Sequence, residues 1–298
     1  MPPAASGKEL VLTSGDYVAR VVTVGAGIAG LTLRGVDLLQ PHAVTEIPEG
    51  YLGKTLVPWP NRIANGSYTW QGIRHDVPVN EGETGCALHG LMCWVDWEVV
   101  HADKDSATLG TFIAPRPGYP WALQCWVTYA LCAEKGLSVT VATKNIGVEA
   151  APYGASSHPY LTVGLTEVDE YSMTIPAATV AEVDEDLIPV ALRPAGDLDL
   201  DLREGRVLGT ARIDHAFTDL PEGPWTVRLT IPATGSWVEI ESDARWVQVY
   251  TGERLGRRGV AVEPMTCAPN AFNSGDGLVE LEPGVTHSLT FTVRGHVA

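Results

Sequence analysis

The sequence predicts an all-β protein, and three observations lead to this prediction. Gly and Pro account for 31 and 21 of the 298 residues and are spread along the chain, which is typical of many short elements separated by turns. Apolar and polar residues alternate with a period of two in many segments. No segment keeps the i, i+3, i+4, i+7 apolar pattern over the turns that a globular helix needs. We therefore expect strands joined by turns rather than a strand–helix alternation.

Alternating segments rich in β-branched and aromatic residues predict strands along the whole chain. In order, they are 17–24, 67–79, 107–112, 122–133, 137–144, 225–231, 237–242, 246–250 and 287–293. Turn dipeptides such as Asn65-Gly66 and Lys135-Gly136 bound them. We interpret residues 183–202 and 254–258 as loops, because strand-like segments of similar composition flank both. The expected organisation is one domain over residues 1–298.

Composition narrows the class of protein. The net charge of −16 would repel phosphate backbones, so a general nucleic-acid-binding protein is not expected. With 45% hydrophobic and 19% charged residues, the chain can bury a large core. It shows neither an N-terminal signal-peptide pattern nor an apolar run long enough to span a bilayer. These features predict a cytoplasmic protein with no membrane partner.

The five cysteines do not indicate a metal centre or a disulfide framework. Their number is odd and no C-x-x-C pair occurs. Reduced and mostly buried thiols are expected instead. The prediction is therefore a protein without a structural zinc site.

The segment Gly25-Ala-Gly27-Ile-Ala-Gly30 matches the dinucleotide fingerprint G-x-G-x-x-G. That motif binds a pyrophosphate only where the following residues begin a helix. Here residues 31–37 alternate, contain another glycine and soon reach Pro41. We expect a strand and a tight hairpin at this place, and no flavin or nicotinamide cofactor.

Two polar residues in the first third of the chain stand out as candidates for ligand contacts. Arg62 lies between proline-stiffened backbone and the Asn65-Gly66 turn, where its guanidinium could be held toward ligand oxygens. Pairing with a loop carbonyl is the structural alternative. His89 lies beside a glycine and before Trp94, which suits a sugar that stacks on rings and forms hydrogen bonds through its hydroxyls. A histidine bonded within a turn would fit the same residues.

Two further residues are suited to proton transfer. His158 precedes Pro159, so its backbone is held extended and its imidazole has few orientations. Glu263 ends an apolar strand, where partial burial would raise the pKa of its carboxyl and make it a better base. A structural glutamate bonded to loop amides is the alternative.

Together these segments resemble the aldose 1-epimerase family, the galactose mutarotases. No single tripeptide is specific, but the matches follow the family order along the chain. The main ones are Asn-Arg-Ile followed by Gly at 61–66, Leu-His-Gly at 88–90, His-Pro-Tyr at 158–160 and Glu-Pro at 263–264. Supporting matches lie at 118–120, 213–217, 249–252 and 281–284.

The resemblance implies a β-supersandwich of two large antiparallel sheets, with a sugar bound in a cleft of loops and strand ends. It implies an isomerase that interconverts the α and β anomers of an aldohexose such as glucose or galactose. Glu263 would be the base at the C1 hydroxyl, and His158 the acid at the ring oxygen, assisted by His89. The implied substrate-binding residues are Arg62, Asn61, Asp214 and Tyr160. The expected partner is the sugar alone, with no cofactor or metal, in a monomer or homodimer.

Elementary acid–base chemistry agrees with these roles. Anomerisation needs one base and one acid at opposite ends of the O5–C1–O1 unit. The reference pKa values of His and Glu, about 6.5 and 4.3, predict an imidazolium beside a carboxylate, and their mutual attraction would widen that gap.

The sequence departs from the usual family pattern near these motifs. Leu161-Thr162-Val163 replaces Phe-Asn-Leu after His-Pro-Tyr, and His215 follows Asp214. These changes leave the sugar open: another pentose or hexose, or one that is modified or phosphorylated at C6. A non-catalytic carbohydrate-binding or sensing protein, or a related epimerase, remains the alternative function.

Overall fold

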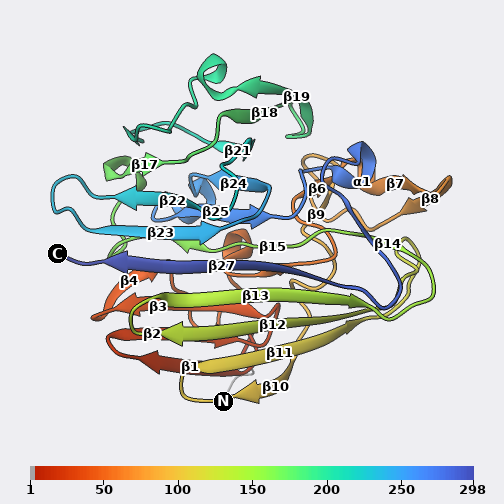
Figure 1. Ribbon diagram of the computed structural model, residues 1–298, viewed down its shortest axis with the longest axis horizontal. Coiled ribbons are helices and arrows are strands. Elements are labelled where there is room, and N and C mark those ends of the chain that lie inside the picture. The colour runs from red at the N-terminus through yellow and green to blue at the C-terminus, as the bar shows by residue number, and fades with distance from the viewer. Residues whose placement is uncertain (1–3) are drawn as a thin grey trace.

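A computed structural model describes residues 4–298, and almost all of its regular structure is strand. Two large antiparallel sheets are layered face to face (Figure 1). No helix of the described part has the length and apolar character needed to cross a membrane. The all-β supersandwich prediction is confirmed.

The larger sheet has twelve strands. Its main path runs β1 (Glu9–Ser14), β2 (Tyr17–Val22), β3 (Gly27–Leu33), β4 (Val36–Leu39), β16 (Tyr160–Leu161), β25 (Val260–Met265), β24 (Trp246–Tyr250), β21 (Asp214–Thr218), β18 (Thr179–Val183) and β19 (Pro189–Pro194). Two short strands join beside β25, namely β15 (Ser156–Ser157) and β5 (Thr55–Leu56).

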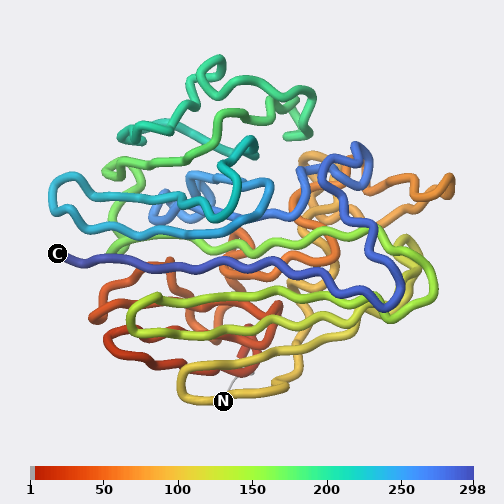
Figure 2. The backbone as a smooth tube through the Cα atoms, in the orientation of Figure 1, coloured from red at the N-terminus to blue at the C-terminus, as the bar shows by residue number. Residues whose placement is uncertain are grey.

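The smaller sheet has nine strands and faces the viewer in Figure 1. Its order is β10 (Glu98–Ala102), β11 (Ser106–Ile113), β12 (Leu123–Cys132), β13 (Gly136–Asn145), β27 (Thr286–His296), β23 (Trp237–Ser242), β22 (Trp225–Thr230), β17 (Ser172–Thr174) and β20 (Arg206–Val207). The C-terminal strand β27 crosses the middle of the molecule, as the tube in Figure 2 shows.

Short elements complete the fold. Three two-stranded pairs are β6 (Arg62–Ile63) with β9 (Ala87–Leu88), β7 (Ser67–Trp70) with β8 (Ile73–Asp76), and β14 (Ala151–Tyr153) with β26 (Val279–Leu281). Among the described residues the single α-helix, α1, spans Ala271–Ser274, and 3₁₀ turns occupy Glu49–Tyr51, Ala64–Gly66, Val168–Glu170, Ala195–Leu198 and Glu253–Leu255.

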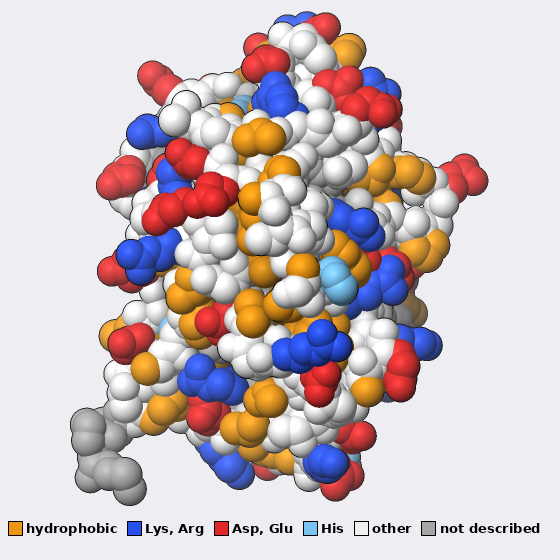
Figure 3. All heavy atoms as spheres, turned by 90° about the vertical axis from the view of Figure 1, so that its left-hand side faces the viewer, with side chains coloured by type: hydrophobic (Ala, Val, Ile, Leu, Met, Phe, Trp, Pro, Cys, Tyr) orange, Lys and Arg blue, Asp and Glu red, His pale blue; other side chains and the backbone are white. Residues whose placement is uncertain are grey.

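Alternation along the strands builds the core between the sheets. In β12 every second residue from Leu123 to Leu131 is buried, as a strand with one face on the core requires. The main apolar cluster joins residues of both sheets, from Leu10 in β1 to Val293 in β27. On the face drawn in Figure 3, acidic and basic side chains are interspersed with small apolar patches. That mixture agrees with excess acidity carried by the solvated surface.

The predicted strands are largely confirmed, with two corrections. Residues 67–79, predicted as one strand segment, contain the hairpin β7–β8, which ends at Asp76 and turns at Gln71-Gly72. Residues 183–202, predicted as a loop, contain β19 at the edge of the larger sheet. Prolines at both ends of β19 hide the strand signal, and an edge is where a sheet tolerates proline.

The glycine fingerprint leads into strand β3, as expected, and not into a helix. Its turn lies against the segment that carries β5: Thr55 N donates to Gly25 O at 3.0 Å, and Ile28 N donates to Gly53 O at 3.0 Å. Gly25 has a φ of +72°, and a Cβ there would lie 2.2 Å from Cys93 O. The glycine therefore serves close backbone packing against Cys93 and the segment that carries β5.

Candidate active site

One cleft over β21, β24 and β25 of the larger sheet is lined by all seven residues predicted for the site. Strands supply Tyr160, Asp214 and Glu263, while loops and short strands supply Asn61, Arg62, His89 and His158. Tertiary folding therefore brings together predicted side chains from five separate segments of the sequence.

Glu263 lies within β25 and not at its end, which corrects the predicted position. It is directly opposite Gln248 on β24, and only 1% of its surface is exposed. Its Oε2 has no hydrogen-bond partner among the described residues. Burial, and then the charge of Asp214, raise the pKa of this carboxyl well above 4.5. Glu263 is thus a strongly basic group once ionised.

His158 is held by backbone contacts on both sides. Its N–H donates to Lys54 O at 2.9 Å, and its carbonyl accepts from Gly53 N at 2.9 Å. The imidazole stacks on Tyr160 with ring centroids 5.0 Å apart, and its Nε2 lies 3.4 Å from Glu263 Oε1. These contacts hold the backbone of His158 and the position of its imidazole ring.

The predicted charge state of this pair is wrong for the free site. Burial lowers the pKa of His158 to about 3 and raises that of Glu263, so both groups favour their neutral forms. The loss of water around both groups outweighs the mutual attraction that predicted the charged pair. Burial therefore favours a neutral imidazole beside a carboxyl whose pKa is raised.

His89 has a defined tautomer. Its Nδ1 accepts the backbone N–H of Asn61 at 3.2 Å, so the neutral ring carries its hydrogen on Nε2. Burial, and then the charges of His158 and Arg62, lower its pKa well below 6.5. The ring lies edge-on to His158, with centroids 5.1 Å apart. His89 is thus a neutral hydrogen-bond donor next to the acid–base pair.

Arg62 forms a two-point ion pair that the sequence did not predict. Its Nε and Nη2 donate to Glu81 Oε2 and Oε1 at 2.7 and 2.9 Å, and both side chains are buried. Thr84 Oγ1 also donates to Glu81. Burial by itself would raise the pKa of Glu81, but these hydrogen bonds outweigh it and keep the pKa below 4.5. The ion pair with Glu81 therefore fixes the orientation of the Arg62 guanidinium and balances its charge before any ligand binds.

The loop that carries Glu81 is tied to the strand that precedes His89. Asn80 Oδ1 accepts from Leu88 N at 2.6 Å, and Asn80 Nδ2 donates to Leu88 O at 3.0 Å. Glu81 lies in a polar, glycine-rich stretch with no feature that distinguishes it from a solvated loop residue. Its role is visible only in three dimensions.

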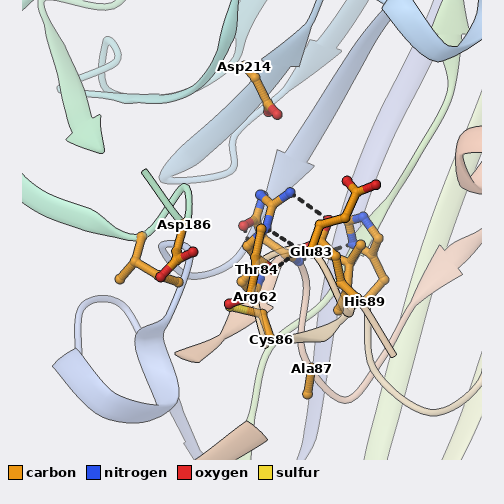
Figure 4. Close-up of polar contacts among 12 residues, drawn as sticks. Arg62, Glu83, Thr84, Cys86, Ala87, His89, Asp186 and Asp214 are labelled. Atoms are coloured by element: carbon orange, nitrogen blue, oxygen red, sulfur yellow. Dashed lines mark hydrogen bonds and ion pairs between the residues drawn. The ribbon is translucent and has the colours of Figure 1, made fainter. Parts of the chain in front are cut away.

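Asp214 faces the same opening as Arg62 from the other side (Figure 4). Gln248 Nε2 donates to Asp214 Oδ1 at 2.6 Å, and burial raises the pKa of Asp214. Tyr160 lines the cleft with its ring, while its hydroxyl donates to Gly50 O at 2.9 Å. Gln248 was missed because a glutamine between two valines in a strand indicates nothing about its partners.

His89, His158 and Glu263 each offer an atom within 4.8 Å of the others, a spacing that could suggest a metal site. The donor set does not fit one. A histidine that ligates through Nε2 normally donates Nδ1–H to an acceptor, whereas Nδ1 of His89 faces an N–H donor. Nδ1 of His158 has no partner among residues 4–298. The cluster is suited to proton transfer instead.

Comparison with known proteins supports the resemblance. A model of the aldose 1-epimerase family matches residues 8–294. The uncharacterized protein YihR of Escherichia coli K12 is 47% identical over 290 residues, covering 97% of this chain and 94% of that protein. Galactose mutarotase of Rattus norvegicus is 28% identical over 222 residues, covering 69% of this chain and 63% of that protein.

Solved structures share the fold. The GalM/aldose epimerase homologue of Caenorhabditis elegans has a TM-score of 0.87 at 20% identity, covering 97% of this chain and 98% of that one. Galactose 1-epimerase of Lactobacillus acidophilus NCFM has a TM-score of 0.81 at 17% identity, covering 95% and 92%. With the family match spanning nearly the whole sequence, the chain belongs to the aldose 1-epimerase family.

Proposed function

We propose that this protein is a mutarotase that interconverts the α and β anomers of an aldohexose such as glucose or galactose. Membership of the aldose 1-epimerase family supports an isomerase. The observation that carries the proposal is the contact between His158 Nε2 and Glu263 Oε1, 3.4 Å apart in the cleft. An acid and a base at that separation can serve adjacent oxygens of one pyranose ring.

Glu263 takes the proton of the C1 hydroxyl as the bond between C1 and the ring oxygen breaks, and His158 gives its proton to that ring oxygen. The products are the free aldehyde and the open-chain hydroxyl. Rotation about C1–C2 turns the other face of the aldehyde toward the hydroxyl, and reclosure with the roles reversed gives the other anomer. No net proton is gained or lost.

Burial favours the ring-opened half of this cycle. Opening converts the pair from imidazolium and carboxylate to neutral imidazole and carboxylic acid, which is the form that burial stabilises. The neutral and ionised pairs contain the same number of protons, so the resting site already holds the one mobile proton that the reaction needs. Because the pair is neutral both in the free site and in the ring-opened state, the open intermediate adds no buried charge to the cleft.

The other residues of the cleft bind the sugar. Arg62, whose Nε and Nη2 donate to Glu81, offers the N–H groups of Nη1 to hydroxyl oxygens. His89 donates Nε2–H near the ring oxygen, and Asp214 accepts hydroxyl hydrogens. Asn61 acts through its backbone, which fixes the His89 tautomer, and Tyr160 supports the His158 ring. No cofactor takes part, and the site acts in the cytoplasm within a monomer or homodimer.

Polarimetry on freshly dissolved α-D-glucose and α-D-galactose tests the proposal. Wild type is expected to accelerate the approach to anomeric equilibrium, while Glu263→Gln and His158→Asn each lose about 10²- to 10⁴-fold in rate. Unchanged rates in both variants would defeat the assigned mechanism. Binding of several aldoses without acceleration would favour the non-catalytic sugar-binding alternative.

The alternative of a modified substrate is tested in the same assay. A panel that includes pentoses and hexose 6-phosphates would favour a related epimerase if one of these exchanged anomers much faster than glucose and galactose. The departures at Leu161-Thr162-Val163 and His215 motivate this panel.

A further inference from the structure

Two buried oxygen atoms at the floor of the cleft have no hydrogen-bond donor. They are Gln248 Oε1 and Glu263 Oε2, and neither has a partner among residues 4–298. Gln248 is 3% exposed and Glu263 is 1% exposed. A buried acceptor left unpaired is costly, so two in one place require an explanation.

The sheet brings these two side chains together. Gln248 and Glu263 are directly opposite each other in the antiparallel pair β24–β25, and both line the cleft. Opposed residues of such a pair have Cβ atoms about 4.5–5.5 Å apart, with side chains on the same face. The two orphan oxygens therefore belong to neighbouring groups.

The orientation of the Gln248 amide is fixed by Asp214. Nε2 donates to Asp214 Oδ1 at 2.6 Å, which leaves Oε1 as the free end of the amide. Rotating the amide by half a turn would instead set its oxygen against the Asp214 carboxylate oxygen. Gln248 consequently offers an acceptor, and not a donor, toward β25.

We propose, on the basis of the mutarotase function above, that Gln248 is a positioning residue that keeps Glu263 a strong base. Gln248 Oε1 accepts a hydrogen bond from the Oε2–H group of Glu263 when the carboxyl is neutral. When that proton leaves, the same amide oxygen repels the carboxylate. The other oxygen of the Glu263 carboxyl, Glu263 Oε1, remains directed at His158 and lies 3.4 Å from His158 Nε2. This one hydrogen bond gives a partner to both unpaired oxygens, Gln248 Oε1 and Glu263 Oε2.

Other charged and titratable groups around Glu263 act from separate elements. Asp214 on β21 raises its pKa, and Arg62 on β6 lowers it. His158 and Tyr160 approach from the β15–β16 segment, and His89 from the loop after β9. Gln248 is uncharged, so Gln248→Met changes the hydrogen bonding of Glu263 without adding or removing a charge, whereas Gln248→Glu adds a carboxyl group beside it.

Difference infrared spectroscopy tests the proposal without relying on turnover. The carboxylic C=O band of Glu263 is assigned by its loss in Glu263→Gln and is titrated in wild type, Gln248→Met and Gln248→Glu. Gln248→Met has a similar length and no acceptor oxygen, so the apparent pKa of Glu263 is expected to fall by about one unit, as one hydrogen bond would produce. Gln248→Glu is expected to shift it upward.

In the dependence of the mutarotation rate on pH, the apparent pKa on the acid side should also fall in Gln248→Met and rise in Gln248→Glu. Equal titration of the Glu263 band in wild type and both Gln248 variants would overturn the proposal, and Gln248→Glu provides the test if Gln248→Met does not fold. Infrared shifts as expected in a protein that accelerates no anomerisation would instead reject the mutarotase function and keep the role of Gln248.

Discussion

The two ends of the cleft both contain buried ionisable groups but are electrostatically opposite. At the charge-paired end (Arg62, Glu81 and Thr84), the ion pair closes through two hydrogen bonds of 2.7 and 2.9 Å. At the acid–base end (His158, Glu263 and Gln248), three polar atoms have no partner within residues 4–298. The difference teaches that burial alone does not set a charge state. Paired groups keep their charges, whereas unpaired groups become neutral and can pass a proton.

The largest expected effect on stability follows from removing Glu81, the partner of Arg62 at the charge-paired end. Glu81→Ala leaves the Arg62 guanidinium buried without a counter-ion, which should lower the free energy of unfolding by about 3–5 kcal/mol. Urea denaturation measures it, with Glu222→Ala on an exposed turn as the control. A loss no greater than that of the control would show that the two ends do not differ as described.

The acid–base end should instead limit stability at the extremes of pH. The folded pKa of Glu263 is raised above 4.5, so its stabilisation is complete below that pH and is lost as pH rises toward the folded pKa. The folded pKa of His158 is lowered from 6.5 to about 3, so its contribution is present above pH 6.5 and is lost as pH falls toward 3.

Each slope amounts to at most about 1.4 kcal/mol per pH unit. Glu263→Gln should flatten the decline on the alkaline side, and His158→Asn the decline on the acid side, in denaturation midpoints measured across pH. Slopes identical to wild type in both variants would contradict neutral resting forms.

His89 lies between the two ends and should affect rate more than stability. His89→Asn keeps a side-chain acceptor for the Asn61 N–H but lacks the Nε2–H donor, so kcat/KM should fall about tenfold to a hundredfold, as for one hydrogen bond to a group that gains charge. His89→Gln, which can place an N–H near Nε2, should lose less. The reverse ranking in mutarotation kinetics would exclude His89 as a donor to the sugar.

The smallest effect is expected at Tyr160. Tyr160→Phe keeps the ring stacked on His158 and removes the hydrogen bond to Gly50 O, so unfolding should cost about 1 kcal/mol less. If the hydroxyl also binds the sugar, KM rises while kcat stays the same. An unchanged KM would limit Tyr160 to supporting His158 and the 49–51 turn.

Local sequence patterns predicted much of the fold. Strands with clear alternation, such as 237–242 and 246–250, agree with β23 and β24 residue for residue. Strand β19 was missed because its terminal prolines resemble loop chemistry, and only pairing with β18 at the sheet edge makes it a strand. Short strands such as β6 and β9, with two residues each, have no periodic signal to detect.

By itself, the sequence determined the all-β class, the family and seven of the residues that line the cleft, because turn chemistry, alternation and ordered short motifs are local properties of the chain. Only the tertiary structure decided which other side chains lie against these residues. Glu81 meets Arg62 across 19 positions, and Gln248 meets Glu263 through strand register. The resting charges also depended on the fold, since desolvation and partner atoms arise only when distant segments exclude water together.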